Sequence, residues 1–479
     1  MEVLNGPEVG SIQNDFMAVI IAGFGKDLLP LTTNYGDEAC PKALLSVANR
    51  PILDYVLSWL EQSKIKDILL ICPALHRVAI HHHINSEMTS SSLRVDLQTV
   101  EESRDAGAGT CALLRQFSSR ITKDFVLLPC DFLPPSNFSL GTLLNRFRID
   151  VLSDGAIGTA CWFPSHKPDK VSYIDDWGVN TPNCSIAWDG ISGTLLYIDT
   201  PDEFDLNAED FRFRTSMISR YPQSKLLANY EDSHVYVCCR SVLTILHEKK
   251  HHVSLREEFL PWLCKLQYRV SKKQRYLQSL QSTLLQRTAS QHSTVRRSIH
   301  QRGSDQKVPV TVLPSATMLS GTGQPSLRVG LVLLDNSLGF TARVNSIYAF
   351  LETNRRFLSD ANFSPPYESK DLYLIDAKAQ VSLDNIIDGS TQVSERANIK
   401  KSVIGRHCLI GRQARIVNSV LLDHCIIGEG ANLDGCILGR GTRIGNKAEL
   451  VRCILQAGSD IASGDSMKGE RIEFSYESY

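Results

Sequence analysis

The sequence predicts an α/β domain followed by a parallel β-helix, and two observations carry this fold class. First, short apolar segments alternate with helical patterns in the N-terminal part of the chain. Such alternation is typical of a mostly parallel, Rossmann-like sheet with helices on both faces. Second, aliphatic residues recur about every six positions in the C-terminal quarter, which predicts the coils of a β-helix.

The alternation assigns the elements of the first domain in order. Strands are expected over 16–22, 67–72, 94–99 and 125–128, and a helix over 53–63. Right-handed crossovers bring the ends of parallel strands to one edge of a sheet. We therefore expect the loop after the first strand and the residues that follow 125–128 to meet at that edge.

The C-terminal repeat predicts a triangular coil with one aliphatic side chain per side in a narrow interior. Most steps are six residues, and steps of five, as at 399 to 404 and 422 to 427, are expected to mark slipped corners. Solenoids of this kind expose faces and edges that usually stack subunits. The residues predicted to point inward are Val381, Ile387, Val393, Ile399, Ile404, Ile410, Ile416, Leu422, Ile427, Leu433, Leu438, Ile444 and Leu450.

Composition divides the chain further. With 479 residues, 43% of them hydrophobic, it can bury two cores. Between residues 271 and 310 there are eight Lys or Arg and one Asp, with few aromatics, which predicts a flexible basic insertion. The expected division is an N-terminal tail over 1–14, the α/β domain over 15–270, the insertion over 271–325, a connecting strand and helix over 326–375, and the β-helix over 376–479.

Charge and cysteine content argue against several classes of protein. A net charge of −1 provides no bulk attraction to nucleic acid or to an anionic membrane. Thirteen cysteines without a Cys-x-x-Cys pair favour reduced thiols over a disulfide framework or a zinc site. The sequence contains no apolar run of membrane-spanning length, and its polar start does not resemble a signal peptide. We expect a cytosolic protein that binds neither membrane nor nucleic acid directly.

A glycine loop follows the first predicted strand directly. Glycines at such a junction let backbone N–H groups approach an anion such as a nucleotide phosphate. The segment from Ala22 to Thr32, with Gly23 and Gly25, is followed by Pro41-Lys42. It resembles the nucleotidyltransferase signature Gly-Gly-x-Gly-Thr-Arg-Leu-x-Pro-Leu-Thr with a later Pro-Lys. The resemblance implies a nucleotidyltransferase fold for residues 15–270.

Three positions depart from this signature: Ala22 stands in place of the first glycine, and the other two bear on the charge of the site. Lys26 stands in place of the threonine, and Asp27 stands in place of the arginine. In the family that arginine neutralises the triphosphate and the leaving pyrophosphate. A carboxylate reverses the local field, and like charges about 4 Å apart repel by several kcal/mol at a modest effective dielectric. We therefore expect a degenerate site with no catalytic residue, although Lys26 could supply a substitute charge.

Three further segments resemble parts of the same pocket. Gly109-Thr110 resembles the loop that holds the nucleotide base and opens a helix. Asp131 follows a predicted strand, as the magnesium-binding aspartate of the family does. Glu258 matches a second metal aspartate but is one methylene longer, which would disturb a tight octahedral site. The expected pocket remnant is Gly23, Gly25, Lys26, Asp27, Lys42, Gly109, Thr110, Asp131 and Glu258, with no cofactor and no metal.

The stretch from Phe340 to Arg356 makes the resemblance more specific, because it matches one kind of subunit. Its Arg-Val-Asn-Ser, Ala-Phe-Leu-Glu and Asn-Arg-Arg segments precede the β-helix and resemble the gamma subunits of eukaryotic translation initiation factor 2B (eIF2B). The gamma and epsilon subunits share a nucleotidyltransferase-like domain and a left-handed β-helix, and epsilon continues into a helical exchange domain. Because the sequence ends at Tyr479, shortly after the last repeat, it resembles gamma.

The resemblance implies a non-catalytic subunit of a guanine-nucleotide exchange factor. Its partners would be an epsilon-like catalytic subunit and the alpha, beta and delta subunits, in a decamer with two copies of each. Its substrate would be initiation factor 2, contacted mainly through the gamma subunit of that factor. Two alternatives stay open: an active sugar-1-phosphate nucleotidyltransferase of the mannose-1-phosphate guanylyltransferase type, and a regulatory subunit that binds a nucleotide or sugar nucleotide without converting it.

Overall fold

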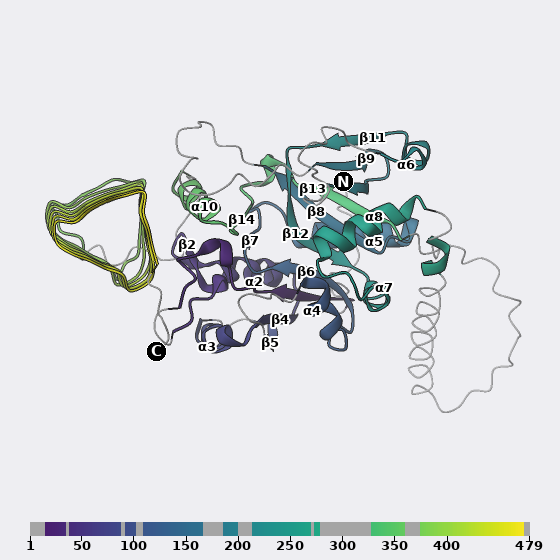
Figure 1. Ribbon diagram of the computed structural model, residues 1–479, viewed down its shortest axis with the longest axis horizontal. Helices are drawn as coiled ribbons and strands as arrows, with labels where there is room; N and C mark the ends of the chain where they lie inside the picture. Colours follow the sequence, from purple (N-terminus) through teal and green to yellow (C-terminus); the bar gives the residue numbers. More distant parts are fainter. Residues whose placement is uncertain are drawn as a thin grey trace, which may run out of the picture.

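The computed structural model describes residues 15–34, 38–87, 92–101, 109–165, 185–199, 213–269, 273–277, 327–359 and 374–473. They form an α/β domain and a triangular β-helix that lies against one end of it (Figure 1). The predicted tail over 1–14 and most of the predicted insertion over 271–325 lie outside the described residues. Among the described helices, none combines the length and apolarity that crossing a bilayer requires.

One ten-stranded sheet organises the α/β domain, in the order β11-β9-β10-β13-β8-β12-β6-β1-β4-β5. The strands β6, β1, β4 and β5 are parallel, as expected. The strands are β1 (Phe16–Ile21), β4 (Asp67–Pro73), β5 (Arg94–Val100), β6 (Asp124–Pro129), β8 (Gly158–Pro164), β9 (Ile186–Asp189), β10 (Thr194–Ile198), β11 (Ser224–Leu227), β12 (Tyr230–Cys238) and β13 (Val329–Leu333).

The expectation of a mostly parallel sheet is wrong beyond β6. Strand β12 runs antiparallel to both β6 and β8, and β9, β10 and β11 pair antiparallel with one another. A short turn joins β9 to β10, and strands joined this way must pair antiparallel, because a parallel pair needs a long crossover. Strand β13 pairs parallel to β8, so the sheet takes a strand from beyond the predicted 15–270 domain.

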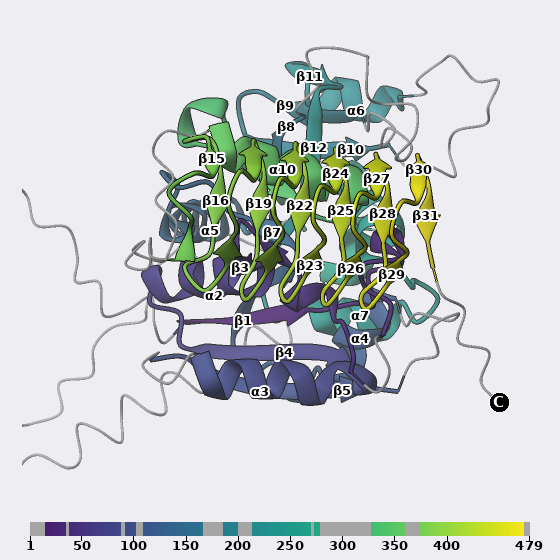
Figure 2. The same cartoon turned by 90° about the vertical axis from the view of Figure 1, so that its left-hand side faces the viewer.

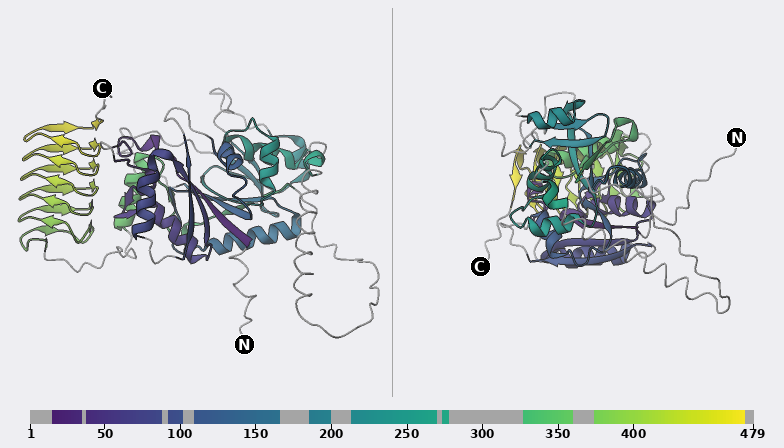
Figure 3. Two further views of the ribbon diagram at one scale, coloured as in Figure 1. Left: turned by 90° about the horizontal axis from the view of Figure 1, so that it is seen from below. Right: turned by 90° about the vertical axis from the view of Figure 1, so that its right-hand side faces the viewer.

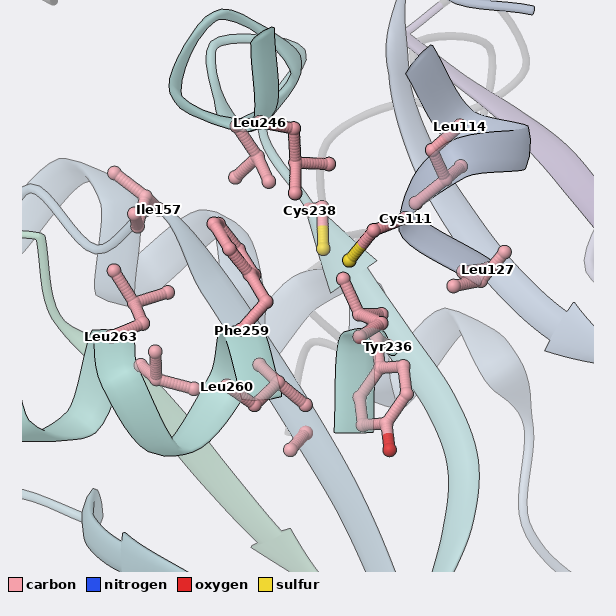
Figure 4. Close-up of a cluster of buried hydrophobic side chains, with 14 of the residues drawn as sticks. Cys111, Leu114, Leu127, Ile157, Tyr236, Cys238, Leu246, Phe259, Leu260 and Leu263 are labelled. Carbon is pink, nitrogen blue, oxygen red and sulfur yellow. The ribbon is translucent and has the colours of Figure 1, made fainter. Parts of the chain in front are cut away.

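The central strands are buried on both faces. Phe16, Ala18 and Ile20 of β1 point to one face, and Met17 and Val19 point to the other. Residues of α2, α3 and α5 cover the first face. Residues of α4, α7 and α8 cover the second, where Cys111, Tyr236 and Phe259 lie in one apolar cluster (Figure 4). The helices are α2 (Ile52–Gln62), α3 (Arg77–Glu87), α4 (Thr110–Gln116), α5 (Leu140–Asp154), α6 (Thr215–Arg220), α7 (Val242–Glu248), α8 (Leu260–Gln267) and α10 (Ile347–Ser359).

The coils of the β-helix stack on one another (Figure 3), and their short strands form three parallel sheets, one on each side of the triangle that Figure 1 shows end-on. The first holds β15 (Gln380–Val381), β18 (Asn398–Lys400), β21 (Arg415–Val417), β24 (Asn432–Asp434), β27 (Glu449–Val451) and β30 (Ser466–Lys468). The second holds β16 (Ile386–Ile387), β19 (Val403–Ile404), β22 (Val420–Leu421), β25 (Ile437–Leu438), β28 (Ile454–Leu455) and β31 (Arg471–Ile472). The third holds β17 (Gln392–Val393), β20 (Leu409–Ile410), β23 (Ile426–Ile427), β26 (Arg443–Ile444) and β29 (Asp460–Ile461).

The predicted interior is correct except at Leu422. Leu421 points inward and is 1% exposed, whereas Leu422 packs toward the α/β domain. From Ile386 onward, equivalent residues of successive coils, such as Ser402 and Ser419, are 17 residues apart, so these coils have one five-residue side and two six-residue sides. Five-residue steps are therefore a regular part of these coils and not slipped corners.

Small residues fill the inner corners of the coils in columns. One column is Ala397, Ala414, Ala431 and Ala448, and each of these alanines is fully buried. The other two columns contain hydroxyl and thiol side chains, which can hydrogen-bond the backbone of the next coil; Cys436 N–H, for example, donates to Ser419 Oγ. These columns hold Thr391, Cys408, Cys425, Thr442 and Ser459, and Ser402, Ser419, Cys436 and Cys453. All cysteines in the described residues are free thiols, and these four pack as small corner residues.

One face of the β-helix packs against the α/β domain. The coils lie across one end of that domain (Figure 2). An apolar cluster with residues of the α/β domain and α10 buries the outward side chains of the second sheet, Ile386, Val403, Val420, Ile437 and Ile454. Asn49, in the turn between two short strands, donates from Nδ2 to the Ile404 carbonyl at 2.7 Å. Leu28 and Leu31 of the glycine-loop segment belong to the same cluster, so this loop also forms part of the interface.

Candidate functional site

The glycine loop leaves the end of β1 and forms a single 3₁₀ turn, η2 (Lys26–Leu28). Gly25 has φ of +78°, which favours glycine, and its carbonyl accepts a hydrogen bond from Thr32 Oγ1 at 2.9 Å. A Cβ on Gly25 would lie 2.9 Å from Lys42 Cβ, so the glycine lets the loop pack on Lys42. The side chains of Lys26 and Asp27 are exposed to solvent.

Lys42, Asp131 and Arg343 form an ion cluster at the ends of β1 and β6. Lys42 Nζ lies 2.5 Å from Asp131 Oδ2, and an Arg343 guanidinium nitrogen lies 3.2 Å from the same oxygen. Strand β14 (Ala342–Arg343) pairs with β7 (Phe132–Leu133) immediately after Asp131, which brings Arg343 beside the aspartate. As expected from the parallel strands, the glycine loop and Asp131 meet at one edge of the sheet. Lys42 joins them, because it packs against Gly25 and pairs with Asp131.

The two cations determine the charge of Asp131. Burial alone would raise the pKa of its carboxyl, but the positive charges of Arg343 and Lys42 outweigh burial and hold the pKa well below its usual range. Oδ1 of Asp131 and Nε of Arg343 are buried and have no hydrogen-bond partner within the described part of the chain. Asp131 is therefore a permanent anion at neutral pH, held through a single oxygen.

A second polar group adjoins this cluster on β12. The strand bulges between Asp232 and Val235, and His234 has φ of +54° there. Asp232 Oδ2 accepts a hydrogen bond from the Tyr236 hydroxyl at 2.5 Å and lies 3.5 Å from Arg256 Nε. Burial, together with the positive charges of Arg343 and Arg256, holds the pKa of His234 well below its usual value. The neutral imidazole therefore adds no positive charge to that of Lys42, Arg343 and Arg256, which face the carboxyl groups of Asp131 and Asp232.

Gly109, Thr110 and Glu258 form a separate group around Val253. Thr110 Oγ1 accepts a hydrogen bond from the Leu255 N–H at 2.8 Å, and Cys111 N–H donates to the Val253 carbonyl at 2.9 Å. Glu258 Oε2 accepts from the Val253 N–H at 2.6 Å. The backbone of Val253 thus packs directly against Gly109, in the segment that resembles the base-holding loop, and Glu258 holds that backbone in place.

Two of the three glycines of the predicted pocket, Gly109 and Gly23, should differ sharply in their response to alanine. A Cβ on Gly109 would lie 2.4 Å from the Val253 carbonyl oxygen, whereas no described atom lies within 4 Å of a Cβ on Gly23. We expect Gly109→Ala to lower the free energy of unfolding by about 1–3 kcal/mol because the backbone must move, and Gly23→Ala to change it by less than about 0.5 kcal/mol. Denaturant titrations followed by circular dichroism measure both changes, and equal losses would contradict the predicted packing.

Sequence reasoning missed Arg343, Asp232, His234 and Arg256 as members of this region. Arg343 was noted for its resemblance to a family segment and was not assigned to the pocket. The polar run around Asp232 interrupts an otherwise apolar strand, and this interruption could have indicated a site. No comparable signal links Arg343 to Asp131, which are 212 residues apart in the sequence.

The magnesium site implied by Asp131 and Glu258 does not fit these contacts. Asp131 is occupied by two cationic side chains, and Glu258 is bound to the Val253 N–H. In the residues that the structure describes, no group of three or more His, Cys, Asp or Glu side chains could hold a metal ion.

Comparison with known protein families agrees with both folded parts. Residues 17–151 match the nucleotidyl transferase family, and residues 365–467 match the left-handed β-helix (LbH) domain of the eIF2B epsilon subunit. The two matches follow each other along the chain in the order of the two domains. They support a Rossmann-like nucleotidyltransferase domain and a left-handed β-helix, as predicted.

Three curated relatives carry the name translation initiation factor eIF2B subunit gamma. The protein of Schizosaccharomyces pombe is 32% identical over 272 residues, covering 55% of this chain and 54% of the relative. That of Caenorhabditis elegans is 23% identical over 261 residues, covering 53% and 59%, and that of Dictyostelium discoideum is 22% identical over 407 residues, covering 78% and 84%. The chain thus spans little more than half the length of the first two relatives. Because the three relatives share one name and the two domains match in order, the chain is an eIF2B gamma-like protein.

Proposed function

We propose that this chain is a non-catalytic subunit of the guanine-nucleotide exchange factor for initiation factor 2. It pairs with an epsilon-like catalytic subunit in the cytosol and promotes the exchange of GDP for GTP on initiation factor 2. The observation that carries the proposal is the similarity to three eIF2B gamma subunits, together with the match of the β-helix to the epsilon LbH domain. The chain contributes binding and stabilisation, and none of its residues takes part in exchange chemistry.

The state of the nucleotidyltransferase pocket supports the non-catalytic part of the proposal. Asp27 presents an exposed carboxylate where the family signature has a phosphate-binding arginine. Asp131, which matches the magnesium-binding aspartate of the family, is paired with Lys42 and Arg343. Val253 packs against Gly109, in the segment that resembles the base-holding loop of the family. Each feature works against the in-line attack of a sugar phosphate on a nucleoside triphosphate, which requires a cationic clamp on the phosphates.

The proposed assembly is a decamer that contains two copies each of alpha, beta, gamma, delta and epsilon subunits. In this assembly the chain contacts the epsilon-like subunit and helps to dock initiation factor 2, mainly through the gamma subunit of that factor. The β-helix offers its first and third sheets for subunit contacts, because the second sheet is buried against the α/β domain. Exposed residues on a free sheet include Leu409 and Ile426, which are 44% and 38% exposed.

Purification at native expression level tests the proposal. The chain is tagged, isolated at moderate salt, and its stoichiometric partners are identified by mass spectrometry together with a native mass. We expect a hetero-oligomer that contains a longer homologue with a helical C-terminal domain, and bound initiation factor 2. A homo-oligomer that lacks both would contradict the proposal.

The sugar-nucleotidyltransferase alternative predicts a different result. The purified chain would release pyrophosphate from a nucleoside triphosphate in the presence of a sugar phosphate and magnesium, and Lys42→Ala would abolish this turnover. We expect no release above a protein-free control. Thermal stabilisation by one nucleotide without product would favour the regulatory alternative.

A further inference from the structure

The carboxylate of Asp131 is neutralised by the chain's own side chains, away from bulk water. Its side chain is 2% exposed, and those of Lys42 and Arg343 are 12% and 17% exposed. Both cations contact the same oxygen, Oδ2. Charged hydrogen bonds in such surroundings are strong, because solvent screens them little.

A divalent cation meets two obstacles at this position. Magnesium requires an octahedral set of oxygen ligands. Here one oxygen of Asp131 already binds two cations, and Glu258 binds the Val253 N–H instead of turning to the aspartate. The local charge is also wrong, because two positive side chains face a single carboxylate and would repel a dication.

We propose that Arg343 takes the place of a divalent metal ion at Asp131 and, with Lys42, neutralises that carboxylate permanently. A guanidinium keeps its charge at every accessible pH and cannot dissociate from the chain as a metal ion can. This inference rests on the proposed function in one respect, which is that a non-catalytic pocket needs no catalytic metal ion. It assigns Arg343 a role in positioning and none in chemistry.

The position of Arg343 gives this replacement a structural consequence. Val344 N–H donates to the Asp131 carbonyl at 2.9 Å, so the ion pair and the backbone bond fasten the same short strand. Val344, Ile347 and Phe350 then enter the apolar cluster that receives the β-helix. Arg343 therefore anchors the segment on which the β-helix docks, and this anchor does not depend on metal concentration.

Manganese binding to the purified full-length chain tests the proposal. Electron paramagnetic resonance detects free Mn²⁺ and measures its depletion by the protein. Arg343→Asp removes the guanidinium and places a second carboxylate beside Asp131. Arg356→Asp is the matched control, because it makes the same charge change on α10, where Arg356 pairs with Glu352 at 3.1 Å. We expect Arg343→Asp to bind Mn²⁺ on the order of ten- to a hundredfold more tightly than the control, the range seen when the surroundings of a metal ligand are altered.

Two results would overturn the proposal. One is Mn²⁺ binding by the wild-type chain that Asp131→Asn abolishes, since Asp131 would then be a metal ligand already. The other is equal Mn²⁺ binding by Arg343→Asp and Arg356→Asp. Thermal unfolding of the wild-type chain should also be unchanged by millimolar magnesium or by a chelator.

A double-mutant cycle covers the case in which Arg343→Asp does not fold. Arg343→Gln and Asp131→Asn should each lower the midpoint of thermal unfolding, and the double variant should lose less than the sum of the two shifts. Additive shifts would show that Arg343 does not act through Asp131. These measurements use the isolated chain, so their outcome is independent of whether the proposed exchange-factor partners are recovered.

Discussion

Replacing Ile437 by aspartate should detach the β-helix from the α/β domain. Ile437 points outward from β25, yet it is 0% exposed because it lies in the apolar cluster between the two parts. A carboxylate there would be buried without a cation among the cluster's aliphatic side chains. Burying an unpaired charge costs several kcal/mol, in addition to about 1.5–3 kcal/mol of lost apolar burial. Separation of the surfaces avoids both costs.

Ile426→Asp is the matched control for this prediction. Ile426 also points outward from the β-helix, one sheet away on β23, and is 38% exposed. The same substitution there should leave docking intact and change the free energy of unfolding by less than about 1 kcal/mol. Small-angle scattering should show a larger radius of gyration for Ile437→Asp alone, and calorimetry should resolve two unfolding transitions. Unchanged scattering for Ile437→Asp would contradict the interface.

The sequence predicted the regular parts of the fold because regular elements repeat their chemistry at fixed spacing. The strand before Gly23 and the aliphatic ladder of the β-helix both follow from such patterns. The direction of β12 could not be predicted in this way, since a buried strand has the same composition whether it runs parallel or antiparallel. The error at Leu422 has a similar cause, because Leu421 and Leu422 are adjacent leucines and only the length of the coil distinguishes them.

The candidate site was less predictable than the fold. The resemblance to the nucleotidyltransferase family assigned Lys42 and Asp131 to one pocket, but it did not predict that they pair with each other. Their contact joins residues 89 positions apart, and Arg343 reaches the same carboxylate from 212 positions away. Contacts of this kind depend on tertiary packing, and no local pattern encodes them. The resemblance matched Asp131 to a magnesium-binding aspartate, and in the structure this carboxylate pairs with Lys42 and Arg343.

Gly439→Ala should be among the most destabilising single-methyl substitutions in the β-helix. A Cβ at this position would lie 2.4 Å from Ala457 N and 2.6 Å from the Gln456 carbonyl carbon, both in the backbone of the next coil. Backbone atoms cannot move aside as a flexible side chain can. The coils are also held together by the hydrogen bond from Gly439 N–H to the Leu455 carbonyl at 2.9 Å. The added methyl group must therefore force neighbouring coils apart, at a cost toward the upper end of about 1–3 kcal/mol.

A second glycine in the same coil provides the control. Gly441 has φ of +71°, and no described atom lies within 4 Å of a Cβ there. Asparagine tolerates this left-handed conformation better than other residues with a side chain, so Gly441→Asn should cost less than about 1 kcal/mol. Far-ultraviolet circular dichroism during urea titration measures both variants. If Gly439→Ala unfolds at the wild-type urea concentration, the coils can absorb a methyl group and the close backbone stacking proposed for this corner is wrong. If it unfolds earlier while Gly441→Asn does not, the loss comes from contact between coils and not from the removal of a glycine as such.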